Sequence, residues 1–153
     1  MIRSLLAAAA LFLVLVPAAL AADPGAALTA DLQKLSADRA TMHSTLIGDI
    51  QKVTADAKAG IGSTNKASLK ATIQADIQKL TADLASNHAT MQADRAQAYA
   101  DYQAAKAAHV KVAQLKSQFQ QLAQLAKQDV LDYQQDLQAA QQALAALKAS
   151  FHK

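Results

Sequence analysis

Apolar residues recur at steps of three and four along most of the chain, the spacing of a helix that buries one face. The first series is Leu28, Leu32, Leu35, Met42, Leu46, Ile50 and Val53, with Arg39 inside the apolar line. A second series is Leu69, Ile73, Ile77, Leu80, Leu84, Met91, Ala98 and Tyr102. These two series predict helices over about 26–59 and 66–107.

The segment 60–65 carries the turn residues of this region. Gly60 and Gly62 are able to take positive φ, and Ser63, Thr64 or Asn65 is suited to cap the following helix. A turn here predicts an antiparallel hairpin. In that hairpin we expect facing residues to have numbers that add to 122 or 123, as do Val53 with Leu69 and Ile50 with Ile73.

A third periodic segment covers about 110–150, where we expect an interaction seam. Its members are Val130, Tyr133, Leu137, Leu144, Leu147 and Phe151. Either the second helix continues unbroken through this segment, or the chain bends near 108–111 and the segment folds back to form a three-helix bundle. Continuity is favoured because neither glycine nor proline follows Gly62. The fold class is therefore all-α, a long coiled-coil-like helical hairpin with one of these two endings.

An octad repeat lies within the first two helices. Residues 31–38 read DLQKLSAD, 49–56 read DIQKVTAD, and 76–83 read DIQKLTAD. The first two copies are eighteen residues apart, which is five helical turns, so equivalent residues return to the same face. Within each octad the first Asp precedes the Lys by three residues, as Asp31 precedes Lys34, which predicts a surface ion pair along the helix.

Composition and charge exclude several classes of function. The formal net charge is +3, and lysines alternate with aspartates without clustering, so we expect no nucleic-acid partner. The chain has no cysteine, and we find neither a phosphate-binding loop nor a dinucleotide motif. We expect no enzyme activity, no catalytic residues and no cofactor.

Histidines were the remaining candidates for metal ligands. His88 and Met91 stand three residues apart, and His43 occupies the equivalent repeat position. In the expected hairpin register His43 faces the region of Leu80, about five helical turns from His88, so the two imidazoles do not share an ion. We therefore expect half-exposed imidazoles and no metal site.

The first 21 residues resemble a secretory signal peptide. Arg3 is followed by the apolar run 5–16, by Pro17 and by the small residues before Ala22. We expect cleavage after residue 21, a single domain over 22–153, and an exported protein in the periplasm or outside the cell. After cleavage we expect no integral membrane segment.

The octads and the terminal lysine resemble the murein lipoprotein of bacterial outer membranes, which forms a coiled coil. The chain departs from that family because no lipid-bearing cysteine follows the signal segment. We expect a non-enzymatic envelope structural or protein-interaction module that pairs with a protein partner or with itself through helix seams. Two alternatives are a periplasmic holdase-type chaperone, whose helical arms this hairpin resembles, and a lipid-surface-binding amphipathic protein.

Overall fold

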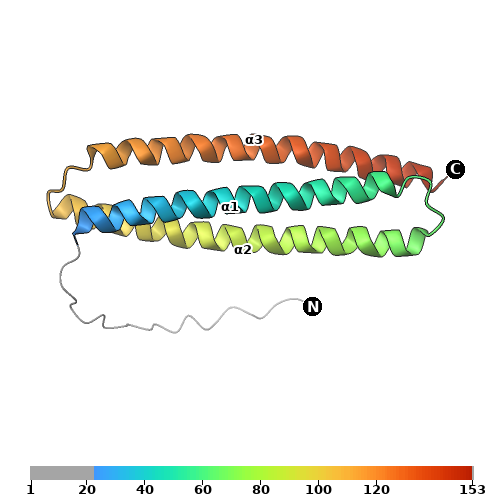
Figure 1. Ribbon diagram of the computed structural model, residues 1–153, viewed down its shortest axis with the longest axis horizontal. Coiled ribbons are helices and arrows are strands. Elements are labelled where there is room, and N and C mark those ends of the chain that lie inside the picture. The colour runs from blue at the N-terminus through green and yellow to red at the C-terminus, as the bar shows by residue number, and fades with distance from the viewer. Residues whose placement is uncertain (1–22, 153) are drawn as a thin grey trace, which may run out of the picture.

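The computed structural model describes residues 23–152, and within that range the chain forms three long helices and no strand. They are α1 (Pro24–Ala59), α2 (Lys66–Ala107) and α3 (Ala113–Ser150). Figure 1 shows α1 lying between α2 and α3, with α2 antiparallel to α1 and α3 parallel to it. The all-α prediction is confirmed. The expected signal segment 1–21 lies outside the described residues, among which no helix is long and apolar enough to span a membrane.

The α1–α2 turn uses the residues that the sequence indicated. Gly62 takes a φ of 84°, a conformation that is strained for other residues. The Asn65 side chain accepts a hydrogen bond of 3.1 Å from the Ser68 amide and so caps α2. At the other end of α1, the Asp23 side chain accepts a 2.9 Å hydrogen bond from the Gly25 amide. Side-chain caps therefore set the starts of both α1 and α2.

The chain folds back between α2 and α3, so the expectation of one continuous helix is wrong. His109 adopts a left-handed φ of 56°. The Val110 amide then donates to the Ala105 carbonyl at 3.0 Å, and the His109 amide donates to the Lys106 carbonyl at 3.1 Å. This is the Schellman arrangement that commonly closes helices, here with histidine in the position that glycine usually fills. Burial of the α3 face offsets the strain at His109.

The face of α3 that packs on α1 follows an unbroken three-four repeat. It consists of Leu115, Phe119, Leu122, Ala126, Asp129, Tyr133, Asp136, Ala140, Ala143 and Leu147. Two of its members, Asp129 and Asp136, accept hydrogen bonds from Arg39 and Gln51 of α1. The seam expected from apolar residues alone was therefore displaced by one residue at Val130 and Leu137, because α1 offers polar partners to the preceding aspartates.

Ion pairs set the register of α1 against α2. Lys34 contacts Asp94, Lys52 contacts Asp76, and Lys79 contacts Asp49; the residue numbers of each pair add to 128. The lysines also pair four residues along their own helices. The expected pairing of Asp31 with Lys34 does not form.

The apolar clusters agree with the register of the ion pairs. Ile73 belongs to the cluster of Ala57, whereas Leu80 packs against the cluster of Ile50 and Val53. The expected pairing of Ile50 with Ile73 is thus wrong. The register differs because the charged flanks of the octads, and not the apolar seam alone, align the two helices.

Candidate functional site

α2 and α3 border a common space, called the cleft below, which is hollowed where residues 70–78 of α2 lie opposite residues 144–151. Each of these helices packs on α1, but among the described residues α2 and α3 share no pair of Cα atoms within 8 Å. Side-chain contacts between the two helices lie near both ends. Tyr102 meets Phe119 edge to face at a centroid distance of 6.1 Å, and Lys66 Nζ donates to the Phe151 carbonyl at 3.0 Å. Between these ties the two helices form facing walls.

Half-exposed aliphatic side chains line both walls. Ile77 is 41% exposed and Leu84 54% on α2, while Val130 is 51% and Leu137 41% exposed on α3. Each pair is separated by seven residues, so its members share one stripe of their helix. Leu144 continues the α3 stripe and lines a common hollow with Ile77, which shows that both stripes border the cleft.

The six residues of the expected seam have three different environments. Leu147 is buried in the cluster of Ala57 and Ile73. Tyr133, Leu144 and Phe151 are partly buried against the two clusters at that end of the bundle. Val130 and Leu137 remain exposed. The seam is therefore not one continuous packed surface, and its exposed members form a wall of the cleft.

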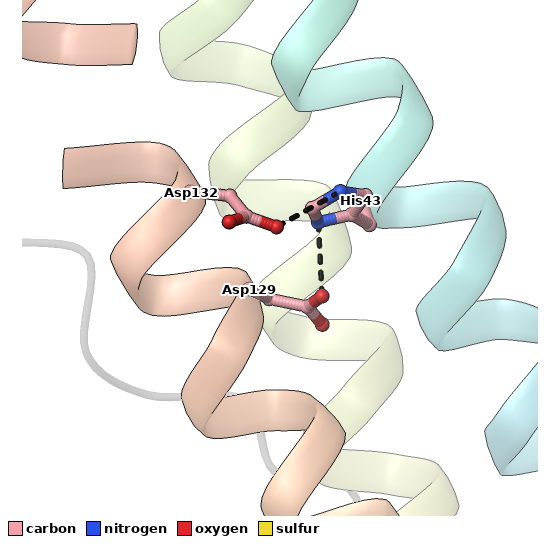
Figure 2. Close-up of side chains that lie close together, drawn as sticks. All are labelled: His43, Asp129 and Asp132. Atoms are coloured by element: carbon pink, nitrogen blue, oxygen red, sulfur yellow. Dashed lines mark ion pairs between the residues drawn. The ribbon is translucent and has the colours of Figure 1, made fainter. Parts of the chain in front are cut away.

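A polar cluster between α1 and α3 was not predicted from the sequence. Figure 2 shows His43 of α1 between Asp129 and Asp132 of α3. His43 Nδ1 lies 2.9 Å from Asp129 Oδ1, and His43 Nε2 lies 3.7 Å from Asp132 Oδ2. Arg39, one turn earlier on α1, contacts the same Asp129 oxygen. The expected position of His43 against Leu80 is therefore wrong.

Neighbouring groups enclose this cluster. The Arg39 guanidinium also donates to the Leu125 carbonyl at 3.1 Å, and the Tyr133 ring lies 5.4 Å from the His43 ring. Burial raises the pKa of Tyr133, and the negative charge of Asp129 adds to that effect. The phenol therefore stays neutral beside the carboxylates. Arg39 within an apolar line of α1 was the sequence signal that a buried acidic partner existed.

The cluster has the donor types of a cation site. One ligand atom from each of His43, Asp129 and Asp132 lies within 4.8 Å of the others. A nitrogen and two carboxylate oxygens suit zinc. However, the Arg39 guanidinium already contacts Asp129, and its fixed positive charge opposes a second cation at that oxygen. The geometry therefore favours an ion-paired clamp between α1 and α3.

His88 and Met91, the other two residues considered as metal candidates, lie apart from the clamp. His88 is exposed on α2, where its Nε2 lies 3.5 Å from Gln92 Nε2, and Met91 is partly buried beside it.

No family model matches the chain, and neither a curated protein nor a solved structure matches it. The function therefore has to be argued from the cleft and the clamp themselves.

Proposed function

We propose that the chain is an exported, non-enzymatic helical module that assembles through the α2–α3 cleft. The occupant we assign to the cleft is a second copy of the chain. The observation that carries this proposal is the exposure of heptad-spaced aliphatic residues on both walls, Ile77 and Leu84 facing the stripe of Val130 and Leu137.

The energetics support an occupied cleft. Each large aliphatic side chain that moves from water into a packed interface contributes about 1.5 to 3 kcal/mol when it is fully buried. A single bundle of three helices leaves these side chains half in water. Contiguous apolar surface of this kind, bordered by polar residues, is typical of interaction sites.

Self-association suits the chemistry of the two walls. Two copies related by a twofold axis present the same patch to one another, so the patch has to be self-complementary. Both walls carry uncharged aliphatic stripes, so like meets like along these stripes. The charged residues of the octads instead pair within the chain, as Lys79 does with Asp49 and Asp83.

Light scattering over a range of protein concentrations tests the proposal. We expect the mass to approach that of a dimer as concentration rises, and the double variant V130D/L137D to remain a monomer with unchanged helicity. The matched control is L125D/L131D, which places two aspartates on exposed leucines of α3 outside the wall stripe. A monomer at every concentration, or equal dissociation by the control, would contradict the proposal.

A further inference from the structure

One end of the cleft is hollowed into an open groove of about 470 Å³. This volume falls in the range of about 300 to 1,000 Å³ that is typical of small-ligand sites. Its apolar lining comes from Ile73 and Ile77 of α2, from Leu144 and Leu147 of α3, and from Phe151, which directly follows α3. The remaining lining residues are polar or cationic, and they lie along its edges on the same two helices.

A contact between the two helices lies next to one end of the groove. Lys66 Nζ lies 5.2 Å from the centroid of the Phe151 ring and donates to the Phe151 carbonyl, so the start of α2 is tied to the end of α3. In the other direction the groove continues into the α2–α3 cleft, past Ile77 and Leu144. An apolar groove that runs between two helices fits a flexible hydrocarbon better than a compact polar molecule.

Two lysines make the groove positively charged. Lys70 of α2 and Lys148 of α3 both line it, and no carboxylate does. Within residues 23–152 neither lysine takes part in an ion pair. The octad lysines differ, because Lys34, Lys52 and Lys79 each contact two aspartates. The groove therefore combines an apolar floor with two lysines that form no ion pair with the residues the structure describes.

We propose that this groove binds a free long-chain fatty acid. The acyl chain lies along Ile73, Ile77, Leu144 and Leu147, and the carboxylate pairs with Lys70 and Lys148. A charge-assisted hydrogen bond to an ammonium is the contact that an otherwise apolar site needs to orient an amphiphile. The site lies within one chain, but it shares Ile77 and Leu144 with the surface proposed for self-association, so a second copy and the fatty acid compete for the groove.

Titration calorimetry with dodecanoate and tetradecanoate, below their micelle concentrations, tests the site. We expect one molecule to bind per chain, with affinity rising about two- to fourfold for each added methylene that is buried. The variant K70Q/K148Q should weaken dodecanoate binding about tenfold and leave binding of dodecanol unchanged. The control K116Q/K127Q removes the same charge from α3, and Lys127 is about 30 Å along the helix from Lys148 at 1.5 Å per residue. This control variant should bind dodecanoate with the affinity of the wild type.

Two further variants distinguish binding in the groove from binding elsewhere on the protein. The variant V130D/L137D changes no residue of the groove lining and removes the competing second copy, so it should bind dodecanoate at least as tightly as the wild type. I77D should weaken binding of both dodecanoate and dodecanol, because it places a charge on the apolar floor. Three results would overturn the fatty-acid site. They are the absence of saturable dodecanoate binding, an equal loss of affinity in both lysine variants, and binding of the protein to anionic phospholipid vesicles without binding of dodecanoate.

Discussion

The Lys79 ammonium of α2 lies 2.6 Å from the Asp49 carboxylate of α1. The reciprocal ion pair also forms, because the Lys52 ammonium of α1 lies 2.7 Å from the Asp76 carboxylate of α2. Asp49 and Lys52 hold the same octad positions as Asp76 and Lys79. The second and third octads thus recognise one another across the hairpin. The repeat therefore fixes the register of α1 against α2, because sliding either helix by one residue separates both ion pairs.

The octad ion pairs predict the pH range of stability. In each octad the lysine donates a hydrogen bond to the last aspartate, which lowers the pKa of that carboxyl below its usual 3.8 and raises the pKa of the Lys52 and Lys79 ammoniums above 10.5. The pairs are Lys34 with Asp38, Lys52 with Asp56 and Lys79 with Asp83. A lowered carboxyl pKa contributes stability that is present above pH 3.8 and is lost as the pH falls through the folded value.

The stability contributed by the lysines depends on pH in the opposite direction. A raised ammonium pKa contributes stability that is present below pH 10.5 and is lost as the pH rises through the folded value. We expect the unfolding free energy, measured in urea from pH 2 to 12, to fall at both extremes. The triple variant K34Q/K52Q/K79Q should show a shallower fall at each end. An identical pH profile in the variant would show that these pairs do not stabilise the fold.

Asp31 is the octad residue that destabilises the hairpin. Desolvation raises its pKa, and the neighbouring Asp101 carboxylate raises it further. Ionisation of Asp31 at neutral pH therefore opposes folding. We expect D31N to raise the unfolding free energy at pH 7 by about 0.2 to 0.5 kcal/mol, the scale of exposed charge interactions. D38N removes a carboxylate that a lysine stabilises, so it should have the opposite sign; a loss of stability in D31N would contradict this assignment.

The clamp between α1 and α3 should show strong coupling between Arg39 and Asp129. Asp129 is buried, so R39M leaves its carboxylate without its guanidinium partner and should lower the unfolding free energy by about 2 to 4 kcal/mol. The double variant R39M/D129L should regain most of that loss, because it removes both charges. Urea unfolding of the two single variants and the double variant measures the coupling. Simple additivity would mean that the contact is not formed in solution.

The turn at His109 predicts which residues allow α3 to fold back. A left-handed conformation costs a β-branched residue about 1 to 2 kcal/mol and costs glycine little. We expect H109V to lower the melting temperature and H109G to hold or raise it, while A107G, within the end of α2, lowers it. Equal effects of valine and glycine would mean that residue 109 does not occupy a left-handed position.

The sequence predicted the parts of the fold that depend on local chemistry. The α1 face and the α1–α2 turn follow from apolar periodicity and from Gly62 and Asn65. The second turn was predicted near 108–111 only as the alternative to a continuous helix, because histidine rarely replaces glycine at a left-handed helix end. The clamp was missed because its acidic residues come from α3, whose position depends on that turn. Arg39 signalled a buried acid without indicating which one.

The displaced seams have one physical cause. In α2 and α3 the aspartates next to the apolar positions turn toward α1, as Asp76 does beside Ile77 and Asp129 beside Val130. A pattern that counts only apolar residues assigns the neighbouring position to the core. The polar partners on α1 reverse that assignment, and they leave the apolar neighbours on the walls of the cleft.

Occupation of that cleft by a second copy is tested most directly by thiol reactivity, because the chain has no cysteine of its own. Single cysteines at Leu84 and Leu137 report the two walls, and one at Leu131 reports an exposed site outside the wall stripe. Alkylation rates are measured from low to high protein concentration. We predict that the thiols at 84 and 137 react more slowly as concentration rises and recover on dilution, whereas the thiol at 131 reacts at a constant rate. Equal and concentration-independent rates at all three positions would contradict the account.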